Sequence, residues 1–241
     1  MSTVVVARRR RLDHTRRCPG RSRLQVLWFD VCESLCRLTL KLCYRFRITG
    51  ESLVPASGPC IFVSNHQSLL DPVLNGCAVV DRQLTAMARE SLFRWKPFAW
   101  LMRSYGAIAL KEEGGDTAAF KAALAELREG RCILIYPEGS RTPDGRVHDF
   151  MPGVALLIRR AQVPVVPMGI EGAFDVWRRG EKWPKLFGRI EVEVGQPIPA
   201  EQLPREPGAL LSLLREQVSE LVRRRGEAMR RTGWRPRRAL P

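Results

Sequence analysis

The sequence CIFVSNHQSLLDP, at residues 60–72, predicts a strand, a turn and the start of a helix in immediate succession. Cys60–Val63 is a short apolar run of the kind that forms a buried strand. The polar residues 64–66 suit a turn, and Pro72 suits the first position of a helix, where its missing N–H is not needed. We therefore expect polar side chains at the carboxyl end of a buried strand.

After Gly50, short apolar runs alternate with segments of helical periodicity. The expected strands are Cys60–Val63, Leu84–Ala88, Ala107–Leu110, Cys132–Tyr136, Val163–Ile170 and Ile190–Val194, and the expected helices are Pro72–Val80, Ser91–Arg103, Thr117–Glu129, Gly153–Ala161 and Leu210–Arg225. This alternation predicts an α/β fold, a single layered domain whose mostly parallel sheet is flanked by helices. Ligands of such sheets bind beyond the carboxyl ends of the strands, so the loops after Val63, Leu110, Tyr136 and Ile170 are expected to be informative.

Residues 22–46 predict an amphipathic helix that precedes this domain. Its apolar stripe recurs every three or four positions, at Leu24, Leu27, Trp28, Val31, Leu35, Leu38 and Leu42. Such a helix can lie in a membrane interface with its apolar face buried by about 5–10 Å. The alternative is that the same face packs against the domain. We divide the chain into a basic flexible arm (1–21), an amphipathic, membrane-associating helical segment (22–46), a main domain (47–225) and a basic tail (226–241).

The net charge of +15 is concentrated at the two ends of the chain. Residues 1–23 and 222–241 each carry seven more basic than acidic side chains, whereas the segment between them is nearly neutral. Basic ends attract polyanions, either nucleic acid or an anionic membrane surface. Because no nucleic-acid-binding motif accompanies them, we expect an anionic membrane surface and no specific nucleic acid as partner. The alternative is that both ends are solvated, flexible segments that aid solubility.

The seven cysteines are odd in number and include no Cys-x-x-Cys pair, and Cys32, Cys36 and Cys43 lie at helical spacing. They are therefore interpreted as small buried hydrophobic residues in a reducing, cytoplasmic compartment. No apolar run approaches the roughly 20 residues of a spanning helix, and no signal-peptide pattern is present. We expect a protein that is neither secreted nor polytopic.

His66 and Asp71 are the first candidates for chemistry. On a regular helix they would lie about 140° apart and could not meet, but the turn before Pro72 allows His66 to face Asp71. A carboxylate that accepts the imidazole Nδ1–H leaves Nε2 as an acceptor, which is the arrangement of a general base and its orienting group. The alternative is an ordinary helix N-cap and an ordinary loop histidine.

The second candidate is YPEGSR, at residues 136–141, directly after an expected buried strand. Gly139 permits a tight turn with exposed backbone N–H groups. Arg141 can bind a phosphate with two hydrogen bonds, and Glu138 could hold that arginine or receive a substrate hydroxyl. The alternative is a polar loop with a surface ion pair.

Together these motifs resemble those of the glycerolipid acyltransferases, with the closest likeness to 1-acylglycerol-3-phosphate acyltransferases. The resemblance rests on N-H-x-x-x-x-D at residues 65–71 followed by YPEGSR at 136–141. Weaker counterparts are GAIALK at 106–111 and VPVVP at 163–167, and the likeness extends over residues 44–198.

Three positions differ mildly from the common family pattern. Tyr136 replaces the usual Phe, Ser140 the usual Thr and Lys111 the usual Arg, and each change preserves shape or charge. We expect such changes to bear on substrate preference rather than on chemistry.

The resemblance implies direct acyl transfer from a thioester, acyl-CoA or acyl carrier protein, to the free hydroxyl of 1-acyl-glycerol-3-phosphate, which gives phosphatidate. His66 would take the hydroxyl proton, with Asp71 orienting it, and no metal ion, cofactor or covalent acyl-enzyme is expected. Arg141 and Lys111 would hold the acceptor phosphate, Glu138 would position it, and backbone N–H groups near Gly139 would stabilise the oxyanion. The supporting motif residues are Asn65, Pro137, Ser140 and Pro167.

The expected setting is the cytoplasmic face of a membrane, as a peripheral or monotopic protein. Three alternatives are compatible with the same residues. The acceptor could be another lysophospholipid, a lyso-aminolipid or glycerol 3-phosphate. The same histidine could serve a thioesterase or esterase, although the chain has no G-x-S-x-G motif. A non-enzymatic polyanion-binding protein is the third.

Overall fold

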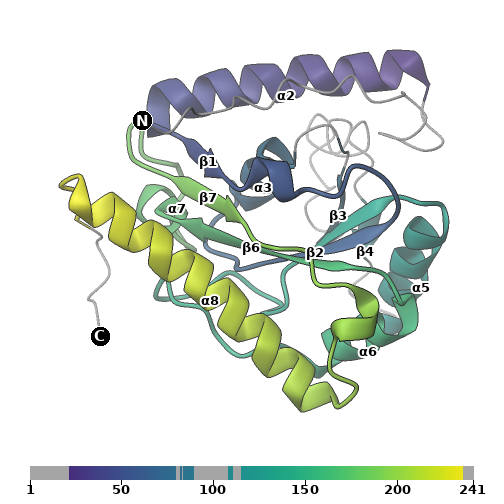
Figure 1. The fold of residues 1–241 in the computed structure, drawn as a ribbon. Coiled ribbons are helices and arrows are strands. Elements are labelled where there is room, and N and C mark those ends of the chain that lie inside the picture. Colours follow the sequence, from purple (N-terminus) through teal and green to yellow (C-terminus); the bar gives the residue numbers. More distant parts are fainter. Residues whose placement is uncertain (1–21, 80–81, 83, 90–107, 111–114, 236–241) are drawn as a thin grey trace, which may run out of the picture.

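The structure, a computed structural model, describes residues 22–79, 82, 84–89, 108–110 and 115–235. Its centre is a seven-stranded sheet in the order β1-β7-β6-β2-β5-β3-β4 (Figure 1). All neighbouring strands are parallel except the antiparallel pair β6 and β7. The strands are β1 (Arg47–Thr49), β2 (Cys60–Ser64), β3 (Leu84–Arg89), β4 (Ile108–Leu110), β5 (Cys132–Ile135), β6 (Val165–Glu171) and β7 (Glu191–Val194).

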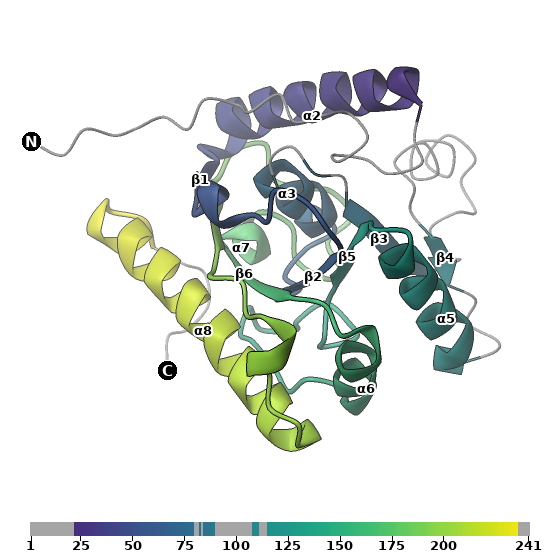
Figure 2. The same ribbon diagram turned by 45° about the vertical axis from the view of Figure 1, so that its right-hand side comes forward.

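Helices cover both faces of this sheet (Figures 1 and 2). They are α2 (Arg23–Tyr44), α3 (Asp71–Ala78), α5 (Gly115–Arg128), α6 (Pro152–Ala161), α7 (Ala173–Val176) and α8 (Pro207–Arg231), with the short 3₁₀ turns η1 (Glu51–Leu53) and η3 (Ala200–Gln202). The predicted α/β layered domain with a mostly parallel sheet and an N-terminal helix is thus confirmed.

Strand β2 shows why this arrangement needs a continuous apolar run. Successive side chains of a strand point to opposite faces. Cys60 and Phe62 therefore join the core beneath α2 and α3, whereas Ile61 and Val63 join the core beneath α5, α6 and α8. Because both faces are covered, every residue of β2 is buried.

Every expected helix and strand that falls within the described residues is present, although its ends are shifted. The largest shift is in α8, which continues to Arg231 and so includes the first residues assigned to the basic tail. Gly226 and Met229 are buried and prolong the inward stripe of this helix, which explains the extension. The short elements β1 and α7 were not predicted. The expected helix Ser91–Arg103 and residue Lys111 lie outside the described residues.

Helix α2 packs against the domain through a face that combines charged and apolar side chains. Arg37 donates to the carbonyl oxygen of Cys77 and pairs with Glu33 at 2.8 Å. Inward-facing Val26, Phe29, Leu40 and Tyr44 are buried. The predicted apolar stripe faces outward, so the alternative that this face packs against the domain is wrong.

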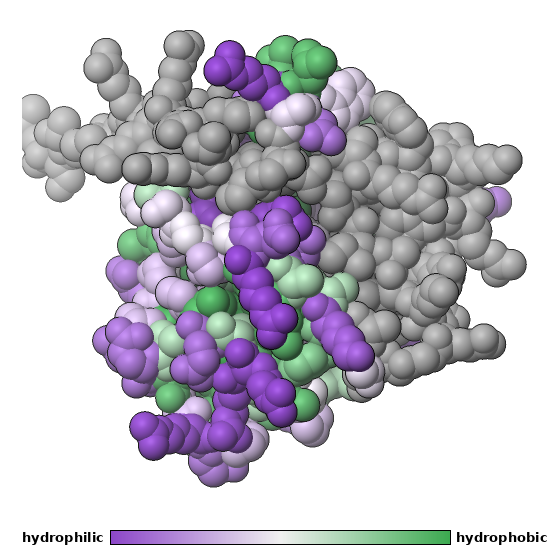
Figure 3. All heavy atoms as spheres, turned by 90° about the vertical axis from the view of Figure 1, so that its right-hand side faces the viewer, coloured by the Kyte–Doolittle hydropathy of each residue, from purple (hydrophilic) through white to green (hydrophobic). Residues whose placement is uncertain are grey.

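The outward stripe is strongly exposed, from 40% at Trp28 to 78% at Leu24. In Figure 3, hydrophobic spheres stand at the upper edge, where α2 lies. Among the described residues, no helix is long and apolar enough to cross a membrane. This outward stripe is therefore an exposed apolar surface of the kind that commonly marks an interaction site.

Candidate active site

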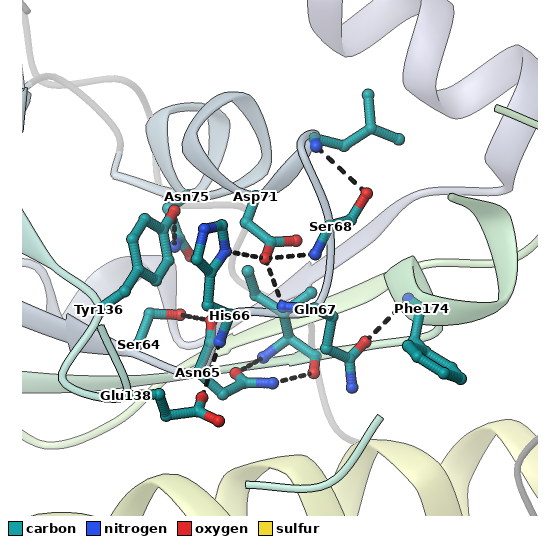
Figure 4. Close-up of polar contacts among 12 residues, drawn as sticks. Ser64, Asn65, His66, Gln67, Ser68, Asp71, Asn75, Tyr136, Glu138 and Phe174 are labelled. Atoms are coloured by element: carbon teal, nitrogen blue, oxygen red, sulfur yellow. Dashed lines mark hydrogen bonds and ion pairs between the residues drawn. The ribbon is translucent and has the colours of Figure 1, made fainter. Parts of the chain in front are cut away.

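Three loops meet at the carboxyl ends of the adjacent strands β5, β2 and β6. The loop after β2 carries His66 and the loop after β5 carries Glu138 (Figure 4). Strand β6 ends at Glu171. This is the edge of the sheet at which the sequence placed the informative loops. The loop expected after Leu110 lies outside the described residues.

His66 and Asp71 form the centre of this region. The distance from His66 Nδ1 to Asp71 Oδ2 is 2.7 Å, and Asp71 is fully buried (Figure 4). The same oxygen accepts the backbone N–H groups of Gln67 at 2.5 Å and Ser68 at 2.8 Å. The two side chains therefore face each other, as predicted.

Asp71 does not act as an ordinary N-cap. Leu70 occupies the cap of α3 without a side-chain hydrogen bond, and Asp71 is the first helical residue. Its carboxylate points back into the loop, where Gln67 and Ser68 donate to it, instead of toward the N–H groups of the helix. The carboxylate thus holds the loop and the imidazole together.

The electrostatics of Asp71 favour a positive partner. Burial raises the pKa of its carboxyl group, whereas the hydrogen bonds from His66, Ser68 and Gln67 act in the opposite direction. Within the described part of the chain, its second oxygen, Oδ1, is buried and accepts no hydrogen bond. Oδ2 therefore carries all of the carboxylate's described hydrogen bonds, including the one to the histidine.

Tyr136 contacts the other side of the imidazole. The two rings stack with centroids 4.1 Å apart and an interplanar angle of 16°. Asn75 Nδ2 donates to the Tyr136 hydroxyl at 3.2 Å. Asp71 and Tyr136 together restrict the ring, and the bond at Nδ1 leaves Nε2 as the nitrogen that can act as a base. Sequence reasoning noted Tyr136 only as a replacement for Phe and missed this contact.

Asn65 attaches the His66 loop to β6. Its Nδ2 donates to the carbonyl oxygen of Ile170 at 2.9 Å, and its Oδ1 accepts the N–H of Ile170 at 2.8 Å. Asn65 is buried, and its amide reproduces the pairing of a backbone residue at the point where β2 leaves the sheet. The supporting role assigned to Asn65 thus has a definite physical basis.

Glu138 joins the His66 loop to the loop after β5. Its two carboxylate oxygens accept the backbone N–H groups of His66 at 2.9 Å and His148 at 3.1 Å. Burial raises the pKa of this carboxyl group, and the two N–H groups oppose the rise. Glu138 is therefore a structural bridge beneath the histidine, a role that its sequence position alone did not indicate.

Gln67 is a second bridge that sequence reasoning missed. Its side-chain amide donates to the carbonyl of Gly145 and accepts the N–H of Phe174, each at 3.1 Å. It therefore links the loops that follow β2, β5 and β6. Its place directly after the histidine was the available signal, but an amide in a loop has no characteristic chemistry.

Most of the remaining predicted site residues lie in the turn that follows β5. Gly139 has a φ of +71° and donates its own N–H to Tyr136 at 3.0 Å, so that N–H closes the turn and is engaged there. The carbonyl of Pro137 accepts from Met151, and Pro167 lies inside β6 beside Val63. Ser140 is exposed, Arg141 is half-buried, and Lys111 lies outside the described residues.

Comparisons with known proteins agree with these motifs. The model of the Acyltransferase family matches residues 45–171. A chloroplastic 1-acyl-sn-glycerol-3-phosphate acyltransferase of Brassica napus is 27% identical over 64% of this chain and 45% of its own length. A lyso-ornithine lipid O-acyltransferase of Pseudomonas aeruginosa is 28% identical over 83% of this chain and 79% of its own length.

A solved structure shares the fold. The crystal structure of the 1-acyl-sn-glycerophosphate acyltransferase of Thermotoga maritima matches with a TM-score of 0.71 and 24% identity, over 88% of this chain and 83% of that one. The chain spans about half the length of the first curated relatives that it matches.

The Asn65 bridge generates a pH prediction. In Asn65→Asp, a protonated carboxyl group can still donate to Ile170 and accept from it, whereas the ionised group cannot donate. Burial and the Ile170 carbonyl raise the pKa of the introduced group above about 3.9 in the folded state, so its contribution is present at low pH and is lost as the pH rises. Urea unfolding from pH 3 to pH 8 should therefore show a stability deficit relative to the natural chain that grows with pH.

Asn65→Ala is the matched control, because it removes both bonds at every pH. We expect this variant to lose about 1–3 kcal/mol of unfolding free energy without this pH trend. A deficit of Asn65→Asp that stays constant with pH would contradict the assigned hydrogen bonds.

Proposed function

Because this chain belongs to the Acyltransferase family, we propose that it transfers a fatty acyl group from an acyl thioester to the free hydroxyl of 1-acyl-glycerol-3-phosphate, producing phosphatidate. The observation that carries the proposal is the 2.7 Å contact between His66 Nδ1 and the buried carboxylate of Asp71. This pair supplies a base and its orienting group, and the acceptor hydroxyl supplies the nucleophile.

In the proposed mechanism, His66 Nε2 takes the proton of the acceptor hydroxyl as its oxygen attacks the thioester carbonyl. A tetrahedral intermediate forms and collapses by breaking the carbon–sulfur bond. The proton on Nε2 passes to the departing thiolate, which restores the neutral imidazole. The acyl group goes directly from sulfur to oxygen, and the chemistry requires no metal ion or further cofactor.

Asp71 would stabilise the imidazolium that exists between the two proton transfers. Its Oδ2 is already aligned with Nδ1, so little reorganisation is needed as the charge develops. The Tyr136 ring faces the same imidazole and would favour the cation through its π-electrons. Both groups would interact more strongly with the imidazolium form of His66 than with its neutral form. Stabilisation that is stronger at this stage of the reaction than in the ground state lowers the barrier.

Arg141 is the proposed anchor of the acceptor phosphate. It follows Glu138 by three positions, and Glu138 holds the backbone of His66. A guanidinium on this turn would bind phosphate near the base while the hydroxyl approaches Nε2. Lys111 is proposed as a second cation for the same phosphate, and backbone N–H groups of the Gly139 turn other than that of Gly139 itself are proposed for the oxyanion.

The second candidate acceptor is a lyso-ornithine lipid. The observation that favours it is the length of the match to the Pseudomonas aeruginosa relative, which covers 83% of this chain and 79% of that one. Such a lipid has a free hydroxyl for the same histidine, but it offers no phosphate to Arg141. The donor is proposed to be acyl-CoA or acyl carrier protein in either case.

We propose that the reaction takes place at the cytoplasmic face of a membrane. The outward apolar stripe of α2 supports a position in the interface, with the helix lying along the surface. The concentration of basic residues at both ends of the chain supports an anionic surface. The cysteine content, odd and without a paired motif, supports the reducing side.

The base is tested with His66→Ala and Asp71→Asn. We expect His66→Ala to lower kcat for lysophosphatidate about 10²–10⁴-fold, because general-base assistance is lost. Asp71→Asn retains an oxygen for the three donors but removes the charge, and it should also lower kcat by an order of magnitude or more. Rates are measured with purified protein, lysophosphatidate and each thioester donor.

The matched control is Asp144→Asn, which alters the solvent-exposed pair of Asp144 and His148, whose Oδ1 and Nε2 atoms lie 2.8 Å apart. This variant should retain near-normal activity. Rates close to those of the natural chain in both His66→Ala and Asp71→Asn would refute the proposed base.

Arg141→Ala separates the two candidate acceptors. If lysophosphatidate is the acceptor, the lost charge-assisted hydrogen bonds should raise its KM about tenfold or more. The KM for a lyso-ornithine lipid, tested in parallel, should change little because it has no phosphate. An unchanged KM for lysophosphatidate would remove the role assigned to Arg141.

A further inference from the structure

The segment that joins α7 to β7, residues 177–189, presents three large hydrophobic side chains to solvent. Trp183, Leu186 and Phe187 are 74%, 70% and 68% exposed. Single exposed hydrophobic residues are ordinary, but three within five residues, two of them aromatic, form a local apolar surface. We refer to residues 177–189 as the Trp183 loop.

The Trp183 loop is braced by hydrogen bonds at its base. The N–H of Lys185 donates to the carbonyl of Val176 at 2.9 Å, and the indole N–H of Trp177 donates to Glu181 at 3.0 Å. The N–H of Arg178 donates to the Glu181 carboxylate at 3.1 Å. The apolar side chains therefore project from an ordered base, which lowers the entropy lost when they bind.

The loop is continuous with the end of α2. Tyr44 donates its hydroxyl hydrogen to the carbonyl of Lys185 at 3.1 Å, and Gly188 donates its N–H to the carbonyl of Cys43 at 3.1 Å. In Figure 1, this segment lies beside the C-terminal end of α2. Leu42, near that end of the outward stripe, is itself 71% exposed. The loop thus adjoins the surface that we propose to lie in the membrane interface.

The charges around the loop indicate what it contacts. The loop holds five basic side chains and one acidic side chain. Arg179 and Lys182 are exposed, whereas Arg189 pairs with Glu191. Arg45 and Arg47, directly after α2, are also exposed. Aromatic residues beside basic ones are typical of segments that insert at the headgroup level of anionic bilayers.

We infer that the Trp183 loop is a second membrane contact, which inserts Trp183, Leu186 and Phe187 into the interface of an anionic bilayer beside α2. This inference rests on the proposed function only for the choice of a lipid partner. A helix lying in the interface makes contact along a line and can rotate about it. A second contact at one end of that line limits the rotation and sets which side of the domain meets the lipid.

The loop also has a direct structural connection to the catalytic region. The loop follows α7, and Phe174 of α7 donates its N–H to Gln67 at 3.1 Å. Gln67 is next to His66 and also donates its N–H to Asp71. The element that orients the protein on the bilayer is therefore attached to the residues that would receive a lipid hydroxyl.

The test is flotation of the full-length protein with phosphatidylcholine vesicles that do or do not contain phosphatidylglycerol. The loop variant carries Trp183→Ser, Leu186→Ser and Phe187→Ser. We expect its partition to phosphatidylglycerol vesicles to fall about tenfold or more, because three apolar side chains no longer leave water. The matched control, Leu156→Ser, alters an exposed leucine of α6 on the other face of the sheet and should partition normally.

A second variant gives a readout of position that does not depend on loss of binding. Trp183→Phe should still float, and brominated phosphatidylcholine should quench the indole fluorescence of the natural chain more than that of this variant. Equal quenching in the two proteins, or normal flotation of the triple-serine variant, overturns the inference. Flotation driven by a protein partner is excluded because only purified protein and lipid are present.

These measurements separate the inference from the proposed activity. Flotation and quenching require no turnover, so they can succeed even if no acyl transfer is found. Where turnover is found, the triple-serine variant should lose activity on acceptor in phosphatidylglycerol vesicles and retain it on a short-chain acceptor in free solution. Equal losses on both acceptors would indicate damage to the site and would overturn the assignment of the loop to membrane contact.

Discussion

The site depends on one buried carboxylate oxygen. Asp71 Oδ2 accepts from the imidazole of His66 and from the backbone N–H groups of Gln67 and Ser68. Burial raises the pKa of this carboxyl group, and the hydrogen bonds from the three donors limit the rise. The loop must therefore fold back over the start of α3, and that fold places a histidine beside an acid five positions later. The proposed catalytic geometry and the loop conformation therefore depend on the same set of hydrogen bonds.

The surrounding fold supplies the supports for this loop. Asn65 pairs with the backbone of β6, Glu138 with the N–H of His66, and Tyr136 with the imidazole ring. Each support comes from a strand adjacent to β2, so the parallel sheet brings them together where its strands end. On the outer side, α2 turns its apolar stripe away from the domain, which fits the proposed position of this helix at a membrane surface.

Much of this could be predicted from sequence, because strong local patterns carry it. The buried strands, the amphipathic helices and the facing of His66 and Asp71 follow from apolar runs, periodicity and Pro72. The short β1 and α7 did not follow, because three or four residues carry little pattern. The strand at 190–194 was predicted, but its antiparallel pairing with β6 was not. The bridging roles of Gln67 and Glu138 are pairings with the backbone of distant loops, which no local pattern encodes. Periodicity predicts the apolar stripe of α2 but does not indicate whether that stripe faces the domain or points away from it. That orientation depends on tertiary packing.

The central claim is that Asp71 holds the Nδ1–H tautomer of His66, so that Nε2 is the base. Nitrogen NMR of protein with ¹⁵N-labelled histidine, at mildly alkaline pH, tests this directly; the chain has three histidines, and His66→Ala assigns the signal. We predict that Nδ1 of His66 carries the proton and that Nε2 has the shift of an unprotonated nitrogen. A protonated Nε2 with an unprotonated Nδ1 would contradict the proposed mechanism.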